Sequence, residues 1–358
     1  MHDKGQLASS LSASELKILN PPSECRKRVF LRPWLVINPH NTQNAFGLWV
    51  LSAIACVSPI IQRFGILPVL FLYDMHSETL RGNRYRAYFL ATVFSLIGAP
   101  LLIAQKTSVV LHPVEQGVIA QRLQLLHSKD ADRETELKTI FSEAGCAADQ
   151  VEEQIVRHKD PPNVICTLPG STNSIIVVGA HFDHADEGLG AVDDWSGASL
   201  LASLYQTLRG DPRKHTFVFV GFTDEEKGLV GSNFYVKHLT KEKLSSVKAV
   251  VNLECLGLTP TKVWASTANP KLLSDLLNVT ASMNVKLNGV NVERVGNDDT
   301  QAFRDKKVPV ITVHSVTQET LPVLHSHRDN LAAVNVDYLY ESYRVMGVYL
   351  AYIDQSFD

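Results

Sequence analysis

The chain downstream of Pro161 and Pro162 alternates short β-branched runs with amphipathic helical runs. The β-branched runs are SIIVVGA, HTFVFVGF, KAVVNLE and PVITVH, and the helical runs are SGASLLASLYQTLR, SNFYVKHLT, PKLLSDLLNVTASM and VDYLYESYRVMGVYLAYI. This alternation predicts an α/β domain with a mainly parallel mixed sheet flanked by helices. Two further helical runs, EQGVIAQRLQLLHSK and ETELKTIFSEAG, come before it. Because ligand sites on such sheets gather at the carboxyl ends of strands, polar side chains at those ends are expected to converge.

The motif GAHFDH places an imidazole and a carboxylate directly after the first of these strands. His181 is expected to ligate a metal, and Asp183 to accept the other ring N–H, which would fix the tautomer and raise the basicity of the ligand. His184 is a weaker candidate, since neighbouring imidazoles often face solvent.

Two acidic pairs follow, in GAVDDWSGA and TDEEKGLVGS. Asp193 or Asp194 is expected to bridge two metals, and the other to cap the helix that follows. A dinuclear site also needs one terminal carboxylate ligand and one free carboxylate that takes a proton from water. Glu225 and Glu226 are expected to divide these two roles.

The remaining ligands are expected late in the sequence. Glu254 ends the run KAVVNLE, and His325 lies in LHSHRDN, with His314 and His327 as the alternatives. Together these clusters supply ligands for two adjacent divalent metals. Such a centre, with one uncommitted carboxylate, is suited to hydrolysing amides.

Two apolar stretches near the N-terminus predict a membrane segment over residues 45–104. The stretch 87–104 has 18 residues with no charge, about the length that crosses a hydrocarbon core of roughly 30 Å. The stretch 45–73 is interrupted by Gln62 and Arg63, and we expect it to form a span or a hairpin that dips in and returns. The alternative is that both are buried helices of a soluble protein.

The predicted organisation is a basic tail over residues 1–44, the membrane segment over 45–104 and a catalytic domain over 105–358. Basic residues tend to stay on the cytoplasmic side, and they cluster in the tail and at Arg81, Arg84 and Arg86. If 45–73 returns to the side from which it enters, both clusters are cytoplasmic. The catalytic domain is then extracytoplasmic, whereas two full crossings would place it in the cytoplasm and the three arginines outside. In either case the protein is expected to be an integral membrane protein in contact with the lipid bilayer.

The net charge and the cysteine spacing argue against a nucleic-acid partner and against a cysteine-based framework or metal site. The net charge of −3 argues against nucleic acid as a partner. The five cysteines are scattered and include no CxxC pair, so neither a disulfide framework nor a cysteine zinc site is predicted.

These motifs, in this order, resemble the M28 family of zinc peptidases from about Ile165 to the C-terminus. The resemblance implies the following roles: His181, Asp193, Glu226, Glu254 and His325 as ligands of two zinc ions, Asp193 as the bridge, Glu225 as general base and Asp183 behind His181. It also implies that Asp299, in GNDDTQAF, precedes a short helix near the substrate pocket.

The chain departs from the family pattern at three positions. The family usually has aspartate at the position of Glu254, threonine at that of Ser326, and a small or polar residue at that of Trp195, which leaves the pocket shape open. The resemblance implies a membrane-anchored dinuclear aminopeptidase acting on peptide substrates. The alternative is a glutaminyl cyclase-like transferase with one zinc held by Asp193, Glu226 and His325.

Overall fold

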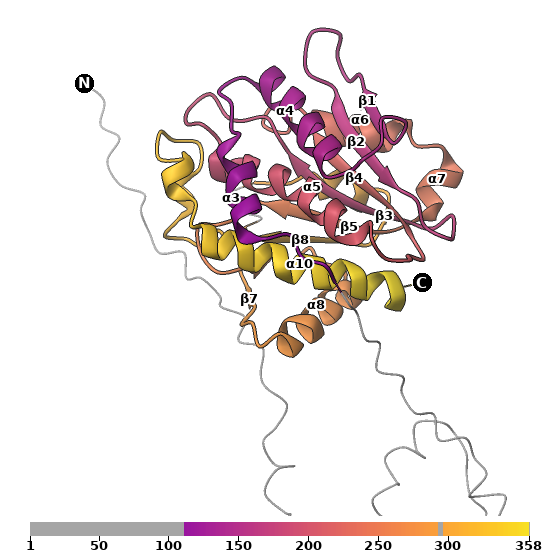
Figure 1. Ribbon diagram of the computed structural model, residues 1–358. Coiled ribbons are helices and arrows are strands. Elements are labelled where there is room, and N and C mark those ends of the chain that lie inside the picture. The colour runs from indigo at the N-terminus through magenta and orange to yellow at the C-terminus, as the bar shows by residue number, and fades with distance from the viewer. Residues whose placement is uncertain (1–110, 293–295, 358) are drawn as a thin grey trace, which may run out of the picture. The chain divides into compact units, whose positions relative to one another are not determined.

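Eight strands form one mixed sheet in the computed structural model, which describes residues 111–292 and 296–357 (Figure 1). The strands are β1 (Val151–Gln154), β2 (Asn163–Leu168), β3 (Ile175–His181), β4 (Thr216–Phe222), β5 (Val247–Glu254), β6 (Lys262–Val263), β7 (Asn288–Gly289) and β8 (Val310–His314). Their order is β1-β2-β4-β3-β5-β8-β6-β7. The central strands β4, β3, β5 and β8 are parallel, and β1, β2 and β6 pair antiparallel with their neighbours toward the centre of the sheet. The predicted fold class is confirmed for this part of the chain.

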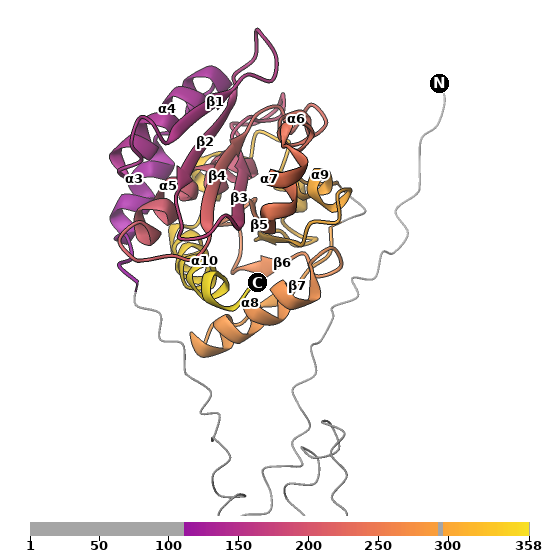
Figure 2. The same cartoon turned by 90° about the vertical axis from the view of Figure 1, so that its right-hand side faces the viewer.

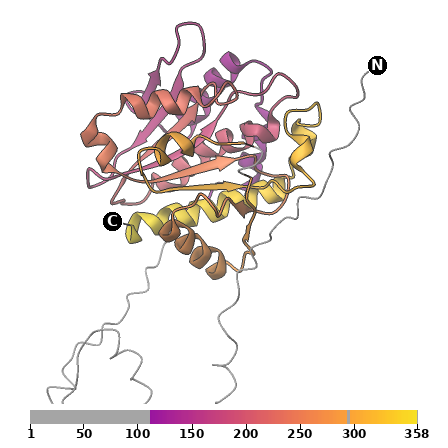
Figure 3. The same ribbon diagram turned by 180° about the vertical axis from the view of Figure 1, so that it is seen from behind.

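Helices cover both faces of the sheet (Figures 2 and 3). One face carries α3 (Gln116–Gln124), α4 (Asp130–Glu143), α5 (Ser196–Leu208) and α10 (Val336–Ser356), and α8 (Pro270–Ser282) packs beside α10. The other face carries α6 (Val230–His238), α7 (Lys241–Ser246) and α9 (Thr300–Arg304). The short turns η2 (Ala191–Trp195), η3 (Leu321–Val323) and η4 (Leu331–Ala333) lie in the connections.

The strands are apolar on both sides because both faces are covered. Consecutive residues of β3 point to opposite faces, so Val177 joins one hydrophobic cluster while Ile176 and Val178 join the other. This is the reason why the strands appear in the sequence as continuous β-branched runs rather than as alternating ones.

The helix boundaries follow local signals in the sequence. The side chain of Asn269 accepts hydrogen bonds from the first backbone N–H groups of α8, and Asn335 does the same for α10. After the end of α4, Gly145 has φ +93°, a positive value that glycine tolerates and that stops the helix from continuing. The two helices predicted ahead of the sheet are present as α3 and α4.

The cysteine spacing indicated no disulfide framework, but the structure contains one disulfide bond. Cys146 and Cys166 are bonded, with a Cα–Cα distance of 6.5 Å, and join the end of α4 to β2. The pair is 20 residues apart in sequence and becomes adjacent only when α4 packs over β2, so no local spacing reveals it. The edge strand β1, with the sequence VEEQ, was also missed because it is short and polar.

The predicted membrane segments, 45–73 and 87–104, lie outside the described residues. Within 111–292 and 296–357, no helix is both long enough and apolar enough to cross a bilayer.

Candidate metal centre

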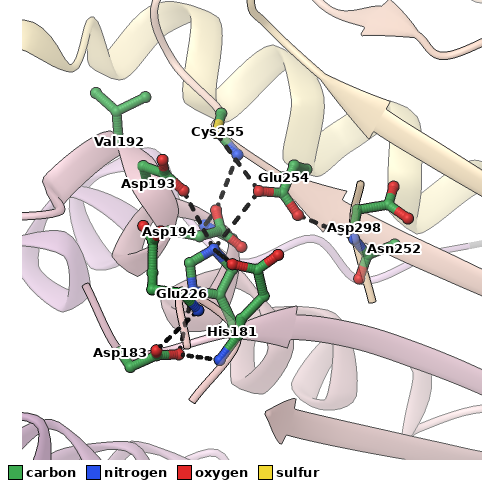
Figure 4. Close-up of polar contacts among 12 residues, drawn as sticks. His181, Asp183, Val192, Asp193, Asp194, Glu226, Asn252, Glu254, Cys255 and Asp298 are labelled. Atoms are coloured by element: carbon green, nitrogen blue, oxygen red, sulfur yellow. Dashed lines mark hydrogen bonds and ion pairs between the residues drawn. The ribbon is translucent and has the colours of Figure 1, made fainter. Parts of the chain in front are cut away.

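The carboxyl ends of β3 and β5 hold the first group of candidate ligands. His181 is the last residue of β3 and Glu254 the last of β5, and Asp193 lies in η2. The Nε2 atom of His181 is 3.1 Å from Oδ1 of Asp193 and 3.5 Å from Oε1 of Glu254. Figure 4 shows both carboxylates converging on this imidazole. These three side chains offer one nitrogen and two oxygens to a single cation.

A second group of ligands shares Asp193 with the first. The Nε2 atom of His325 is 3.1 Å from Oδ2 of Asp193 and 3.1 Å from Oε2 of Glu226. Asp193 therefore directs one carboxylate oxygen to each imidazole. Within the described residues, the buried Oε1 of Glu226 has no hydrogen-bond partner, which suits an oxygen that faces a cation. Paired sites that share one carboxylate are the arrangement of dinuclear metal centres.

The turn that presents Asp193 is held by its neighbours. Asp329 accepts hydrogen bonds from the backbone N–H of Val192 at 2.7 Å and of Asp193 at 3.2 Å. Gly190 enters the turn at φ +53°, where a Cβ would lie 2.6 Å from the carbonyl oxygen of Asp193. Asp194 belongs to neither group of candidate ligands in the described residues, and it accepts from the backbone N–H of Gly197 and Cys255, at 3.0 Å each. The alternative between the two aspartates thus resolves to Asp193 beside the imidazoles and Asp194 at the start of α5.

Asp183 connects the imidazole of His181 to the acidic pair. Its Oδ1 atom lies 3.4 Å from Nδ1 of His181 and accepts the backbone N–H of Glu225 at 3.0 Å. Its Oδ2 atom accepts the backbone N–H of Glu226 at 3.1 Å. These contacts with His181 and the backbone donors lower the pKa of Asp183 even though burial opposes its charge. One buried carboxylate therefore orients three parts of the site.

The site is strongly anionic. Burial opposes a charged His181 ring, but the surrounding carboxylates, Glu225 foremost, raise the pKa of His181 well above its ordinary value. Hydrogen bonds to Asp193 and Glu226 raise the pKa of His325 to about 10. Burial, reinforced by the charges of Asp299 and Glu254, raises the pKa of Glu225 well above its usual range. An excess of negative charge contributes to all three pKa shifts, and it attracts cations to the cluster.

Glu225 belongs to neither ligand group. Its Oε2 atom lies 4.0 Å from Nε2 of His181, so it faces the site without joining either set of donors. Glu226, its neighbour, is in the second group. The structure thus separates two adjacent glutamates that residue chemistry alone left interchangeable.

A cavity of about 680 Å³ opens onto this cluster. Its lining combines the acidic residues with apolar and neutral ones: Asp193, Glu225, Glu226, Glu254, Asp298, Leu229, Trp264, Val292, Thr312, His314, Val316, Leu321, Leu324 and His325, with Gly228, Cys255, Gly296 and Asn297. Asp299 is only 1% exposed and is not part of the described lining, although its charge acts on Glu225. Its neighbour Asp298 lines the cavity instead. Trp195 is also absent from that lining, and its indole donates to the carbonyl oxygen of Leu123 at 3.1 Å.

The alternative histidines have other partners. Nδ1 of His184 pairs with Asp130 at 2.8 Å, and His314 accepts from the backbone N–H of Val316 and contacts the carbonyl oxygen of Val290. Neither histidine, nor His327, belongs to a ligand group in the described part of the chain.

Two supporting residues were missed or undervalued in the sequence. Asn252 donates to Oε2 of Glu254 at 3.0 Å, and its position two residues earlier on the same strand face was a usable signal. Asp329 acts on the η2 turn across 136 residues of sequence, and no local pattern indicates such a contact.

The sequence profile of peptidase family M28 matches residues 163–350, which is more than half of the chain. The chain therefore belongs to this peptidase family.

Among curated relatives, the chain is 24% identical to Aminopeptidase YwaD of Bacillus subtilis over 226 residues, covering 61% of this chain and 48% of that protein. It is 35% identical to Aminopeptidase Y of Saccharomyces cerevisiae over 96 residues, covering 26% of this chain and 18% of the relative. The chain thus spans about half or less of the length of these relatives.

Solved structures share the fold. LapB from Legionella pneumophila aligns with a TM-score of 0.60 at 18% identity, covering 68% of this chain and 73% of LapB. A glutaminyl cyclase from an Acidobacteriales bacterium aligns with a TM-score of 0.58 at 19% identity, covering 70% of this chain and 99% of the cyclase. Both likenesses show the α/β architecture alone.

Proposed function

We propose that this protein is a zinc-dependent aminopeptidase that removes N-terminal residues from peptides. The observation that carries the proposal is the sharing of Asp193 between two ligand groups, each completed by one histidine and one glutamate. Membership of peptidase family M28 and the aminopeptidase relatives support a hydrolytic role for this centre.

The ligands fit two zinc ions per chain. Zinc is commonly bound by imidazole nitrogen and carboxylate oxygen, and each group offers one of the former and two of the latter. Bound zinc supplies a Lewis acid for the scissile carbonyl and lowers the pKa of water toward about 7. His181 and Glu254 would hold one ion, His325 and Glu226 would hold the other, and Asp193 would offer one carboxylate oxygen to each.

Glu225 is the proposed general base. It faces His181 without joining either ligand group, so its carboxylate is free to take a proton from water and then deliver it to the departing amine. Asp183 keeps the His181 ring and the backbone of Glu225 in place through the contacts of its two oxygens. Each of these steps uses a side chain that already faces the cluster.

The cavity supports a substrate with a free amino terminus. Its lining carries carboxylates beside apolar side chains, and no lysine or arginine occurs among its described members. Such a surface attracts an α-ammonium group through the acidic residues. It leaves room for an uncharged side chain against Leu229, Trp264, Val316 and Leu324.

The single-zinc transferase of the glutaminyl cyclase type is the weaker alternative. It would leave His181 without a ligand role, and no contact in the site favours it over the two-ion arrangement. The 3.1 Å and 3.5 Å approaches of His181 to Asp193 and Glu254 support a nitrogen ligand for a second ion.

The test replaces Glu225 with Gln and assays turnover of a panel of aminoacyl anilides, with and without chelator. We expect turnover to fall by roughly 100-fold or more, because general-base catalysis is lost, while the zinc content stays unchanged. Glu226→Gln is the matched control, and it should lose zinc together with activity. Retained turnover in Glu225→Gln would remove that residue from the proposed role.

We further propose that residues 45–104 anchor the protein in a membrane and that the catalytic domain faces an oxidising, extracytoplasmic compartment. The disulfide between Cys146 and Cys166 supports this location, since such bonds persist mainly in oxidising compartments.

A glycosylation site in the sequence can show on which side of the membrane the catalytic domain lies. Asn278-Val279-Thr280 is an N-glycosylation sequon, and Asn278 is exposed on α8. Translation of the full chain with microsomes should add one glycan, which Asn278→Gln should abolish. An unglycosylated chain in membranes that glycosylate a control protein would contradict the orientation.

A further inference from the structure

Arg133 is a fully buried arginine on α4, which lies outside the segment that matches the peptidase family. Its guanidinium donates to three backbone carbonyls, those of His127 at 2.7 Å, Phe182 at 3.0 Å and Leu189. The planar fork of arginine can satisfy several acceptors at fixed angles, which a single ammonium group cannot do.

Two of these carbonyls belong to the segments that carry the candidate ligands. Phe182 lies between His181 and Asp183. Leu189 precedes the η2 turn, and its backbone N–H donates to the carbonyl oxygen of Asp329 at 2.7 Å. Because Asp329 holds the backbone of Asp193, Arg133 connects both ligand-bearing loops to α4.

Three nearby carboxylates, those of Asp130, Asp183 and Asp329, balance the charge of Arg133. Burial lowers its pKa to about 10, against the opposing effect of Asp130, Asp183 and Asp329, so the guanidinium is protonated at neutral pH. Asp183 and Asp329 are the carboxylates that orient His181 and the η2 turn. The cation therefore acts on both supporting acids at once.

Other contacts join the same layer to the site. The indole of Trp195 donates to the carbonyl oxygen of Leu123 on α3, and His184 pairs with Asp130 on α4. Trp195, which follows the two aspartates of the η2 turn, thus contacts helix α3.

We propose that Arg133 is a positioning residue for the metal centre and that, through it, helix α4 sets the affinity and geometry of metal binding. This inference rests on the proposed function of the site as a zinc centre. Without the guanidinium, the carbonyls of Phe182 and Leu189 lose a buried donor and the two ligand loops lose their common anchor. Supporting contacts of this kind typically change metal affinity by roughly 10- to 100-fold.

The experiment compares Arg133→Lys and Arg133→Met with Arg122→Met in the full-length protein. Arg122 is a matched control because it is a buried arginine of the same helical layer, but its guanidinium donates to Ser203 at 2.8 Å and Gln206 at 2.7 Å on α5. Zinc affinity is measured by chelator competition, thermal stability by melting, and coordination geometry by the visible spectrum of the cobalt-substituted protein.

We expect both Arg133 variants to bind zinc roughly 10-fold or more weakly and to alter the cobalt spectrum. Arg122→Met should lose stability with zinc affinity and spectrum unchanged. If Arg133→Met does not fold, Arg133→Lys decides, because it keeps the buried charge. Wild-type affinity in a folded Arg133 variant, or equal weakening in Arg122→Met, would overturn the inference. A wild-type protein that binds no zinc would instead refute the proposed function.

Discussion

Replacing Asp183 with Asn should weaken metal binding and destabilise the fold at the same time. The carboxylate accepts backbone N–H groups from Glu225 at 3.0 Å and Glu226 at 3.1 Å, and it is only 1% exposed. An asparagine keeps one acceptor oxygen and turns an amide donor toward the other N–H. One charge-assisted hydrogen bond is lost and a buried donor is left unpaired, which together cost about 3 kcal/mol. Zinc affinity should fall roughly 10- to 100-fold, because the partner of the His181 ring is no longer a charged carboxylate.

Asp354→Asn is the matched control for this substitution. Asp354 is also buried and accepts two backbone N–H groups, from Lys214 at 3.0 Å and His215 at 2.7 Å, but it touches no candidate ligand. Urea unfolding of the chelator-treated proteins should give similar losses of stability for the two variants. Chelator competition should give weaker zinc binding for Asp183→Asn alone. If both variants keep wild-type zinc affinity, Asp183 does not orient the metal ligands.

Two further predictions concern stability. Burial lowers the pKa of His314 from 6.5 to about 4, so the unfolded chain takes up the proton first as the pH falls. Neutral His314 therefore contributes fully to the free energy of unfolding above about pH 6.5. This contribution, up to about 3 kcal/mol, is lost as the pH falls toward 4. In the chelator-treated His314→Gln protein, the free energy of unfolding should fall less steeply between pH 6.5 and 4 than in the wild type. The same pH dependence in both proteins would contradict this. Replacing Cys146 and Cys166 together with Ala should lower the free energy of unfolding by about 3 kcal/mol in urea titrations, whereas wild-type stability would show that the bond constrains little.

The sequence predicted the sheet well where both faces are buried. The runs that became β3, β4, β5 and β8 are continuous and β-branched because helices cover both sides, and the helices between them have clear starts and stops. The strands β1 and β7 contain no fully buried residue, and β6 is only two residues long, so these strands leave little hydrophobic pattern in the sequence. The disulfide depends on the packing of α4 over β2, which spacing does not encode.

The candidate ligands were predictable because strand ends converge in a parallel sheet. His181 and Glu254 end neighbouring strands, and the motif order supplied Asp193, Glu226 and His325. Residue chemistry alone did not separate Asp193 from Asp194 or Glu225 from Glu226, since these choices depend on backbone conformation.

The contacts that support the ligands were not predictable in the same way. Asp329 is 136 residues from Asp193, and Arg133 is 56 residues from Leu189. Each acts through backbone groups, and no side-chain pattern reveals such contacts. Asn252, two residues before Glu254 on one strand, is the exception.

The most direct test of the central claim is the number of zinc ions per chain, measured by elemental analysis of the purified protein. In a second measurement, zinc is added stepwise to the chelator-treated protein and turnover of an aminoacyl anilide is followed. Two ligand groups that share Asp193 predict two ions per chain, with both required for full turnover. Retention of one ion, or of none, would contradict the shared site from which the proposed hydrolysis follows.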